Sequence, residues 1–238
     1  MEQKPIDFYG GEVLLVDKPL NITSFGAVNR IKRAFIQVTK KKRYKIGHAG
    51  TLDPLATGLL IMCSGKKTKT ISTFQDLPKE YTASIILGAS TPCYDLEMEV
   101  DKTYDISDIT EKQVIECAES FVGEQDQYPP IFSAKKIEGK RAYDLARAGE
   151  EVKMKPNRIT IYEFEILEIN LPEVKVRIKC SKGTYIRSIA NDFGVKLNNG
   201  AYLTNLRRTK IGEYDVENAY SIEEIQQRIF DSEFTPLS

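Results

Sequence analysis

Residues 45–67 read KIGHAGTLDPLATGLLIMCSGKK, and this stretch constrains the fold more than any other. Glycines at positions 47, 50 and 58 surround an Asp53-Pro54 pair, and the apolar run 59–63 follows directly. Asp-Pro favours a turn, because the aspartate bonds its own backbone and proline presets φ. The pattern predicts a glycine-rich turn that leads into a buried strand.

This turn is a candidate place for chemistry, because loops on rigid scaffolds often carry function. Asp53 supplies a carboxylate, Thr51 a hydroxyl, and His48 is the single histidine of the chain. Plainer interpretations exist, since Asp-Pro opens many ordinary turns and a lone histidine is more often structural than catalytic. The turn alone leaves both interpretations open.

Periodicity predicts strands at residues 13–16, 59–63, 79–87, 159–169 and 174–180. Helices are predicted to begin near residues 23–24, 110, 140, 184 and 221, and residues 125–139 are predicted to be irregular. The helix that begins near residues 23–24 is predicted to direct Phe25, Val28, Ile31 and Phe35 inward. The helix that begins near residue 110 is predicted to direct Val114, Ile115, Ala118 and Phe121 inward.

Strands joined mostly by hairpins and single helices indicate an α+β protein with a mixed, largely antiparallel central sheet and flanking helices. Residues 1–214 are expected to form one domain, and residues 215–238 a short helical tail. A segment that short falls below the roughly 40 residues that a free-standing domain needs.

Charge is segregated along a chain whose formal net charge is zero. Residues 28–47 hold eight basic and no acidic residues, and residues 171–210 hold nine basic and two acidic ones. Residues 95–126 and 213–238 are acidic. A single charged run is more often a solvated face, but two separated basic blocks favour a polyanionic partner such as nucleic acid.

Several classes of protein are excluded. No apolar run approaches the ~18 residues of a transmembrane helix, and the first residues lack the apolar core of a signal peptide. Four cysteines without a C-x-x-C spacing favour a reduced, cytoplasmic location over a disulfide framework or a zinc knuckle. One histidine excludes a His-rich metal site.

Two further residues can act together with the Asp53 turn. Arg187 lies where a strand gives way to a helix, and it is either a surface arginine or the partner of a carboxylate whose pKa it lowers. Tyr81 lies in a predicted strand, and it is either an ordinary strand aromatic or a platform on which a base stacks.

The segment GHAGTLDPLATG at 47–58 resembles the signature of the TruB family of pseudouridine synthases. Other segments resemble motifs of that family in the same order: Asp17-Lys18-Pro19 with Thr23-Ser24, Lys79-Glu80-Tyr81, Pro129-Pro130 to Ala146-Arg147, Lys182 to Arg187, and Leu206 to Thr209. The resemblance covers residues from about 11 to 214.

The resemblance implies a pseudouridine synthase fold with an RNA-gripping insertion at about residues 125–158. It implies a bacterial-type enzyme, a monomer without cofactor or metal, that converts the uridine of the tRNA TΨC loop at position 55 to pseudouridine. The base is flipped, its glycosidic bond is cleaved at an aspartate, and the base is rotated and rejoined through C5.

The resemblance also implies roles for particular residues. Asp53 is the catalytic aspartate, Tyr81 stacks on the flipped uracil, Arg187 pairs with Asp53, and His48 fills the space vacated by displaced bases. The substrate-binding site is further expected to include Lys18, Thr51, Leu52, Leu203, Tyr185, Lys135 and Arg141. Covalent attack by the carboxylate and abstraction of a ribose proton both stay open.

The chain departs from the family pattern in two places. Ala49 replaces a threonine that is common in bacterial members, and the chain is too short for an additional C-terminal RNA-binding module. Three rival functions stay open: a non-catalytic RNA-binding protein on the same scaffold, a hydrolase that releases uracil, and a member of the guide-RNA branch of the family.

Overall fold

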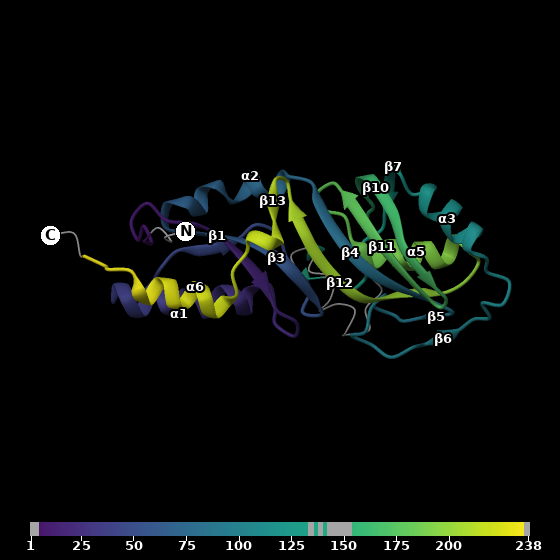
Figure 1. Cartoon of the computed structure of the whole chain (residues 1–238), viewed down its shortest axis with the longest axis horizontal. Helices are drawn as coiled ribbons and strands as arrows, with labels where there is room; N and C mark the ends of the chain where they lie inside the picture. The colour runs from purple at the N-terminus through teal and green to yellow at the C-terminus, as the bar shows by residue number, and fades with distance from the viewer. Residues whose placement is uncertain (1–4, 133–135, 138–139, 142–153, 236–238) are drawn as a thin grey trace. The chain divides into compact units, whose positions relative to one another are not determined.

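The computed structural model describes residues 5–132, 136–137, 140–141 and 154–235, with backbone alone for 136–137 and 140–141. The chain forms two compact units, Met1–Lys79 with Arg207–Ser238, and Glu80–Leu206. Figure 1 shows their helices and strands. The prediction of one domain over residues 1–214 remains a prediction, and part of the expected insertion lies outside the described residues.

The first unit combines a short antiparallel sheet with helices from the N-terminal and C-terminal parts of the chain. Its strand order is β1-β3-β12, with β2 also paired to β3 and β13 to β12. The elements are β1 (Val13–Lys18), α1 (Ser24–Thr39), β2 (Ile46–His48), β3 (Ala56–Ser64), η1 (Gly65–Thr70), α2 (Ile71–Asp76), the end of β12 (Ala201–Ile211), β13 (Tyr214–Asp215), η2 (Val216–Asn218) and α6 (Ile222–Asp231).

Helix α1 begins where the sequence predicts, because the side chain of Thr23 accepts a hydrogen bond from the backbone N–H of Gly26. Val28, Ile31 and Phe35 are buried as predicted. The prediction for Phe25 is wrong, because its side chain is 69% exposed. Ile31 lies at the centre of the buried face, and at about 100° per residue Phe25 points about 120° away from it.

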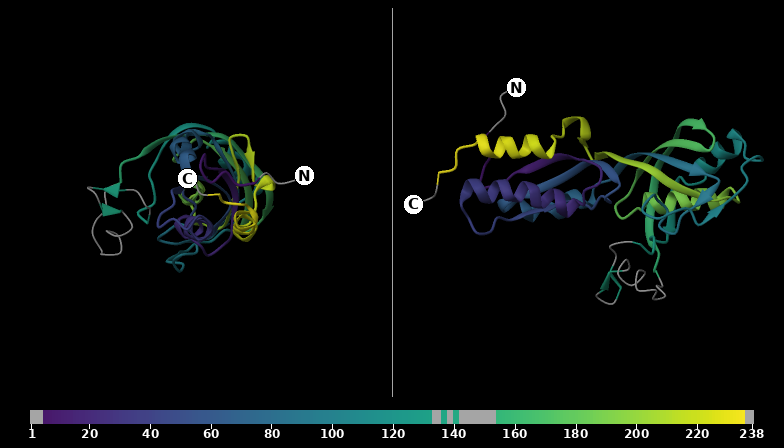
Figure 2. Two further views of the ribbon diagram at one scale, coloured as in Figure 1. Left: turned by 90° about the vertical axis from the view of Figure 1, so that its left-hand side faces the viewer. Right: turned by 90° about the horizontal axis from the view of Figure 1, so that it is seen from below.

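Helix α6 lies beside α1, as the views in Figure 1 and Figure 2 agree. Ser221 and Glu224 form the predicted capping box at its start. Its Ile222, Ile225 and Ile229 are buried in one apolar cluster with residues of α1 and β1. The predicted helical tail therefore contributes to the core of the first unit.

In the second unit the strand order is β12-β4-β11-β10-β7. The elements are β4 (Lys79–Leu87), β5 (Ala89–Ser90), β6 (Lys102–Thr103), α3 (Glu111–Glu119), β7 (Gly123–Gln127), β8 (Lys136–Ile137), β9 (Lys140–Arg141), β10 (Asn157–Asn170), β11 (Glu173–Cys180), α5 (Ile186–Lys196) and the start of β12. The predicted strand 79–87 coincides with β4, and the predicted strand pair forms the antiparallel hairpin β10–β11.

Three local predictions in this unit are wrong. Ile115 is 43% exposed, because the inward face of α3 is formed by Val114, Cys117 and Ala118. Residues 125–127, from the segment predicted to be irregular, are paired with β10 as part of β7. Residues 140–141 form β9 rather than the start of a helix, and the rest of that predicted helix lies outside the described residues.

Candidate functional site

Asp53 lies on a closed turn between β2 and β3, and its side chain is half-buried. The backbone N–H of Ala56 donates to the carbonyl oxygen of Asp53 at 3.1 Å. The N–H of Asn21 donates to the carbonyl oxygen of Pro54 at 2.9 Å, which ties the turn to the loop before α1. The predicted glycine-rich turn is thus confirmed, and its backbone is fixed from outside as well as from within.

Ser24, the first residue of α1, holds the residue before Asp53. Its buried hydroxyl accepts from the N–H of Leu52 at 2.8 Å and donates to the carbonyl oxygen of Leu52 at 2.9 Å. Such a reciprocal pair satisfies both polar groups of one residue without water. The position of the Asp53 backbone is therefore coupled to the start of α1.

Arg208 holds the two ends of the turn together. Its side chain is 1% exposed, and it donates from Nε to the carbonyl oxygen of Leu59 at 2.7 Å and from Nη2 to that of Gly50 at 3.2 Å. Gly58 is required beside it, because a Cβ there would lie 2.3 Å from the Arg208 carbonyl oxygen. Gly58 also has a φ of +101°, which L side chains rarely adopt.

Lys18 brings a second buried cation to this turn. It occupies the last inward-facing position of β1, after Leu14 and Val16, and its Nζ donates to the carbonyl oxygens of Pro19 at 2.9 Å and Ile22 at 2.8 Å. Burial lowers the pKa of Lys18 to about 8, although the negative charge of Asp53 opposes that shift. At neutral pH a charged ammonium therefore accompanies the Asp53 carboxylate.

His48 is held in β2 opposite Met62. Its Nδ1 is buried, and among the described residues it has no hydrogen-bond partner. Burial lowers the pKa of His48, so the ring is neutral at pH 7. A neutral ring fits a space-filling role better than proton transfer, and that role stays a prediction.

Within the second unit, Arg187 and Leu203 both hold the loop at residues 93–95. Arg187 is 4% exposed, its Nη1 lies 3.5 Å from Oδ2 of Asp95, and it donates to the carbonyl oxygen of Cys93 at 3.4 Å. The backbone N–H of the buried Leu203 donates to the carbonyl oxygen of Tyr94 at 2.9 Å. Burial excludes the surface interpretation of Arg187.

Tyr81 and Tyr185 are also placed by the second unit. Tyr81 lies in β4, the predicted strand, and its side chain is buried. Tyr185 precedes α5, and its N–H and carbonyl form a reciprocal pair with the buried Gln127 side chain at 2.7 and 3.0 Å. Lys135 lies outside the described residues, and Arg141 is described as backbone alone.

The predicted site residues therefore fall into two sets. The first unit holds His48, Thr51, Leu52 and Asp53 with Lys18; Thr51 is exposed and Leu52 buried. Tyr81, Tyr185, Arg187 and Leu203 belong to the second unit. The pairing of Arg187 with Asp53 stays a prediction.

The sequence analysis missed the supporting roles of Asn21, Ser24 and Arg208. A signal for Arg208 existed, because it occupies an inward position of β12 in phase with Leu206. A cation in the apolar phase of a strand needs buried partners. Ser24 lies at the predicted helix start and in a segment that resembles a family motif, but no local pattern reveals its bonds to Leu52.

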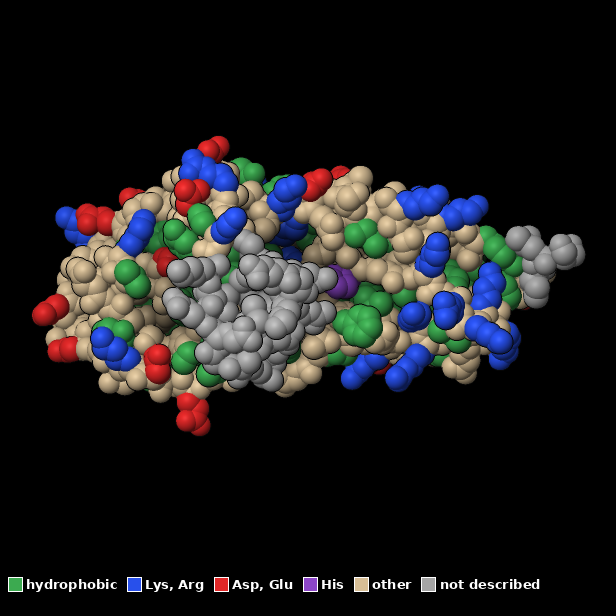
Figure 3. All heavy atoms as spheres, turned by 180° about the vertical axis from the view of Figure 1, so that it is seen from behind, with side chains coloured by type: hydrophobic (Ala, Val, Ile, Leu, Met, Phe, Trp, Pro, Cys, Tyr) green, Lys and Arg blue, Asp and Glu red, His purple; other side chains and the backbone are tan. Residues whose placement is uncertain are grey.

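Most basic residues of 28–47 remain available for a partner, although Nζ of Lys41 lies over the rings of Tyr9 at 5.1 Å and Phe234 at 5.6 Å. Seven of them are exposed, and within the described residues none forms an ion pair: Arg30, Arg33, Lys40, Lys41, Lys42, Arg43 and Lys45. The N–H of Gly65 donates to the carbonyl oxygen of Lys45 at 2.9 Å, which places the lysines of η1 next to this block. Figure 3 shows the resulting gathering of Lys and Arg side chains.

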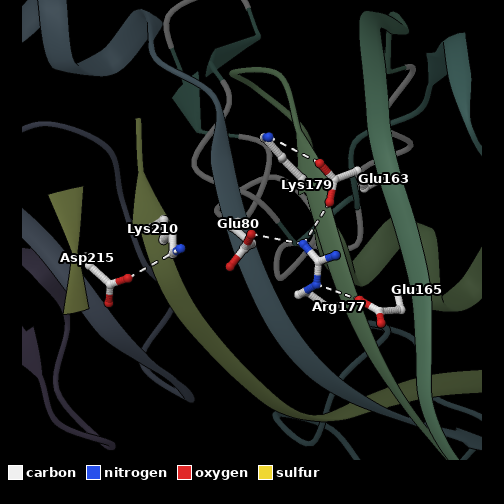
Figure 4. A network of polar contacts seen from close by, with 7 residues as sticks. All are labelled: Glu80, Glu163, Glu165, Arg177, Lys179, Lys210 and Asp215. Atoms are coloured by element: carbon white, nitrogen blue, oxygen red, sulfur yellow. Dashed lines mark hydrogen bonds and ion pairs between the residues drawn. The ribbon is translucent and has the colours of Figure 1, made fainter. Parts of the chain in front are cut away.

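The basic residues of 171–210 behave differently. Arg177 contacts Glu165 at 2.7 Å, Glu163 at 2.8 Å and Glu80 at 3.0 Å, and Lys179 contacts Glu163 at 3.2 Å (Figure 4). Other members of the block are paired or buried: Lys175 with Glu168, Arg187 with Asp95, Arg207 with Asp17, Lys210 with Asp215, and Arg208. Most of the second block is therefore already paired with carboxylates or buried, and its contact with a polyanion stays a prediction.

Other kinds of site find little support. Across the described ranges, no group of three or more His, Cys, Asp and Glu residues could hold a metal ion. All four cysteines are buried free thiols, and burial raises the pKa of Cys117 to about 11. In the part of the chain that the structure describes, no helix is long and apolar enough to cross a membrane.

Comparison with known proteins identifies the class. A family profile described as TruB family pseudouridylate synthase (N terminal domain) matches residues 34–186. A protein of Flavobacterium johnsoniae named tRNA pseudouridine synthase B is 55% identical, over 92% of this chain and 96% of that one. Its namesake in Phocaeicola vulgatus is 53% identical, over 92% and 93%.

Solved structures agree with this fold. A crystal structure of a Cbf5-Nop10-Gar1 complex matches with a TM-score of 0.69 and 28% sequence identity over 95% of this chain. A crystal structure of the archaeal box H/ACA sRNP Nop10-Cbf5 complex matches with a TM-score of 0.65 and 25% sequence identity over 92% of this chain. The chain spans about half of those two chains, 57% and 54%. The α+β fold and these matches define an enzyme of the pseudouridine synthase class. Within that class, the chain belongs to the TruB family.

Proposed function

We propose that this chain converts uridine to pseudouridine at position 55, in the TΨC loop of tRNA. The relatives that support a tRNA substrate are about as long as this chain and more than half identical to it. The observation that carries the proposal is the Asp53 turn, which Asn21 and Ser24 fix from one other segment and Arg208 from a second. A carboxylate on so fixed a turn suits a reaction that needs exact placement.

The reaction starts with a uridine that is stacked inside a folded loop. Flipping it out costs a few kcal/mol, and stacking on an aromatic ring such as Tyr81 offsets part of that cost. The neutral His48 ring would fill the space left behind. These steps bring the glycosidic bond to Asp53.

Cleavage of that bond builds positive charge on the ribose, as in glycoside hydrolysis. The Asp53 carboxylate would stabilise this charge or attack the ribose carbon as the bond to N1 breaks. The detached uracil would then turn and its C5 would bond to the ribose carbon, displacing the carboxylate where it has attacked, while C5 loses its proton and N1 gains one. Abstraction of a ribose proton is the alternative route. In either route a carboxylate that is already in place needs no reorganisation as the charge develops.

Two cations support Asp53 in this proposal. Lys18, charged at neutral pH, brings a positive charge to Asp53 within the first unit. Arg187 would pair with Asp53 in the assembled site and orient it, while Asp95 holds the arginine. The apolar strand β3, which follows Asp53, would help to keep water away from the detached base.

The direct test is Asp53→Asn on an unmodified tRNA transcript, with chemical mapping of pseudouridine. Turnover should fall by roughly a thousandfold or more, while RNA affinity changes less than about threefold. The matched control is Asp108→Asn, an exposed aspartate of the second unit, which should leave both unchanged. Turnover that survives in Asp53→Asn would contradict the proposal.

The same assay separates the rival functions. Free uracil among the products would indicate the hydrolase, and binding without any product the non-catalytic RNA-binding protein. Activity that appears only with an added guide RNA and partner proteins would indicate the guide-RNA branch. This alternative is worth testing because one matched structure is an archaeal box H/ACA sRNP complex.

We also propose that the enzyme acts in the cytoplasm as a monomer, without cofactor or metal. Full activity after treatment with EDTA, together with a mass near 27.0 kDa from light scattering, is the expected outcome. A dimer in solution or a loss of turnover on chelation would contradict it.

A further inference from the structure

Phe25 is the most exposed large hydrophobic side chain that the structure describes, at 69%. Leu20, in the loop before the same helix, is 52% exposed. Single apolar side chains on a surface are common and need no explanation by themselves. The location of these two residues is what calls for one.

Both residues adjoin the bonds that hold the Asp53 turn. Leu20 precedes Asn21, whose N–H donates to Pro54. Phe25 follows Ser24, whose hydroxyl is bonded to both polar groups of Leu52. The loop and the first turn of α1 therefore present apolar side chains to solvent at the rim of the Asp53 turn.

Phe25 also stands at the head of a basic helix face. Seven residues correspond to about 700° of rotation, so Lys32 points within about 20° of the direction of Phe25 and lies roughly 10 Å further along α1. Arg33 follows on the same side, and α1 contains no acidic residue. Figure 3 shows hydrophobic side chains beside the histidine, with Lys and Arg side chains gathered over the same face.

An aromatic ring on a basic helix that contains no acidic residue matches the chemistry of an unpaired nucleotide, since bases stack on rings while cations follow the phosphates. A protein partner with an apolar surface would gain less from the cations, which favours RNA as the occupant. Burying Phe25 under a base would also remove from water the apolar area that the fold leaves exposed.

We propose that Phe25 stacks on an unpaired base of the substrate RNA next to the flipped uridine, with Leu20 beside it. The proposal rests on the proposed function for the identity of the RNA. Phe25 touches no reacting atom in this role. It is a binding and positioning residue, which holds the loop of the RNA against the Asp53 turn.

The test compares Phe25→Ala, Phe25→Leu and Phe25→Tyr by their Kd for an unmodified TΨC stem-loop and by kcat at saturating RNA. The matched control is Phe230→Ala, because Phe230 is an exposed phenylalanine (44%) on another helix of the same unit, α6. Both phenylalanines are exposed, so truncation leaves no cavity and Tm should stay within a few degrees.

Phe25→Ala should raise Kd about tenfold with kcat within about twofold, because one stacked base is lost. Phe25→Tyr should bind like the wild type, Phe25→Leu nearly as weakly as Phe25→Ala, and Phe230→Ala should change nothing. An unchanged Kd for Phe25→Ala, an equal change for Phe230→Ala, or full binding by Phe25→Leu would overturn the stacking contact.

Failure of the proposed function would look different. If the wild type binds the stem-loop without forming pseudouridine, and Phe25→Ala still weakens binding, the contact stands and the proposed reaction falls. If the wild type forms pseudouridine and Phe25→Ala binds normally, the reaction stands and the contact falls.

Discussion

The two units use their positive charge in opposite ways. In the first unit, the exposed lysines and arginines of residues 28–47 face solvent without acidic partners among the described residues. In the second unit, Arg177 and Lys179 are bound by glutamates of β4 and β10 (Figure 4). The formal net charge of zero describes neither unit.

This difference bears on where RNA binds. A cation without a protein partner can take the place of counterions on a phosphate, which gives affinity that falls with salt. A cation already held by two or three carboxylates would have to give up those partners first. We therefore expect the first unit, which also carries Asp53, to provide most of the electrostatic affinity for RNA.

The largest effect should come from Arg187, the second-unit cation whose pair is buried rather than exposed. Arg187→Ala leaves Asp95 without its ion pair in a site where both side chains are at most 7% exposed. Loss of one partner of a buried pair costs about 3–5 kcal/mol of unfolding free energy. Urea denaturation should show this loss, and turnover should fall by about a hundredfold or more while RNA affinity changes little.

The double variant Arg187→Ala/Asp95→Ala is the control for that result. It removes the unpaired carboxylate, so it should recover part of the lost stability without recovering turnover. Equal losses of affinity and turnover in Arg187→Ala would indicate that Arg187 binds phosphate instead.

The next effect concerns the buried cation of the first unit. Burial lowers the pKa of Lys18 from 10.5 to about 8, so its ammonium loses its proton, and Asp53 its counter-charge, as pH rises through 8. The value of kcat/KM should then fall about tenfold for each pH unit above 8. A profile that stays flat up to about pH 10 would show that the charge of Lys18 is not needed. Lys18→Arg, which stays charged, should give that flat profile.

A smaller effect tests the unpaired cations directly. Replacement of Lys40, Lys41 and Lys42 by Gln should reduce the slope of log Kd against log salt by up to about 3, one for each phosphate that a lysine no longer neutralises. Lys175→Gln/Lys179→Gln, in which both lysines already have glutamate partners, should leave the slope unchanged. If the second pair of changes flattened the slope more than the first, the assignment of RNA binding to the first unit would be reversed.

The smallest effect is expected in the ion-pair network of the second unit. Arg177→Met removes three exposed or half-exposed pairs, which contribute little individually. Tm should fall by about 2 °C, and the Kd for RNA should not change. Weaker RNA binding by this variant would contradict this expectation, because it would mean that Arg177 contributes to the RNA contact.

Local patterns predicted most of the secondary structure. Strand β4 follows from alternation of Tyr81, Ala83, Ile85 and Leu87, and the capping boxes at Thr110 and Ser221 mark where two helices start. Phe25 and Ile115 were misplaced because the sequence shows which residues are apolar but not where a helix directs its buried face. Each lies at the edge of an apolar stripe.

Interactions over long sequence separations could not be predicted. Arg177 and Glu80 are 97 residues apart, and Arg208 and Leu59 are 149 apart. A basic run therefore gives no indication of whether distant carboxylates neutralise it. The Asp53 turn itself was predictable, because glycine, aspartate and proline encode it locally, whereas the side chains that fix it, those of Ser24 and Arg208, come from two other segments.

The first unit is built from residues on both sides of residues 80–206. This discontinuity has a consequence for protein synthesis. A ribosome that has reached Leu206 has supplied Asp53 and the whole second unit, but neither Arg208 nor α6. The nascent chain thus carries the aspartate before it carries the guanidinium that joins Gly50 to Leu59. Competence for chemistry should therefore arise only after Arg208 and α6 have emerged from the ribosome and completed the first unit.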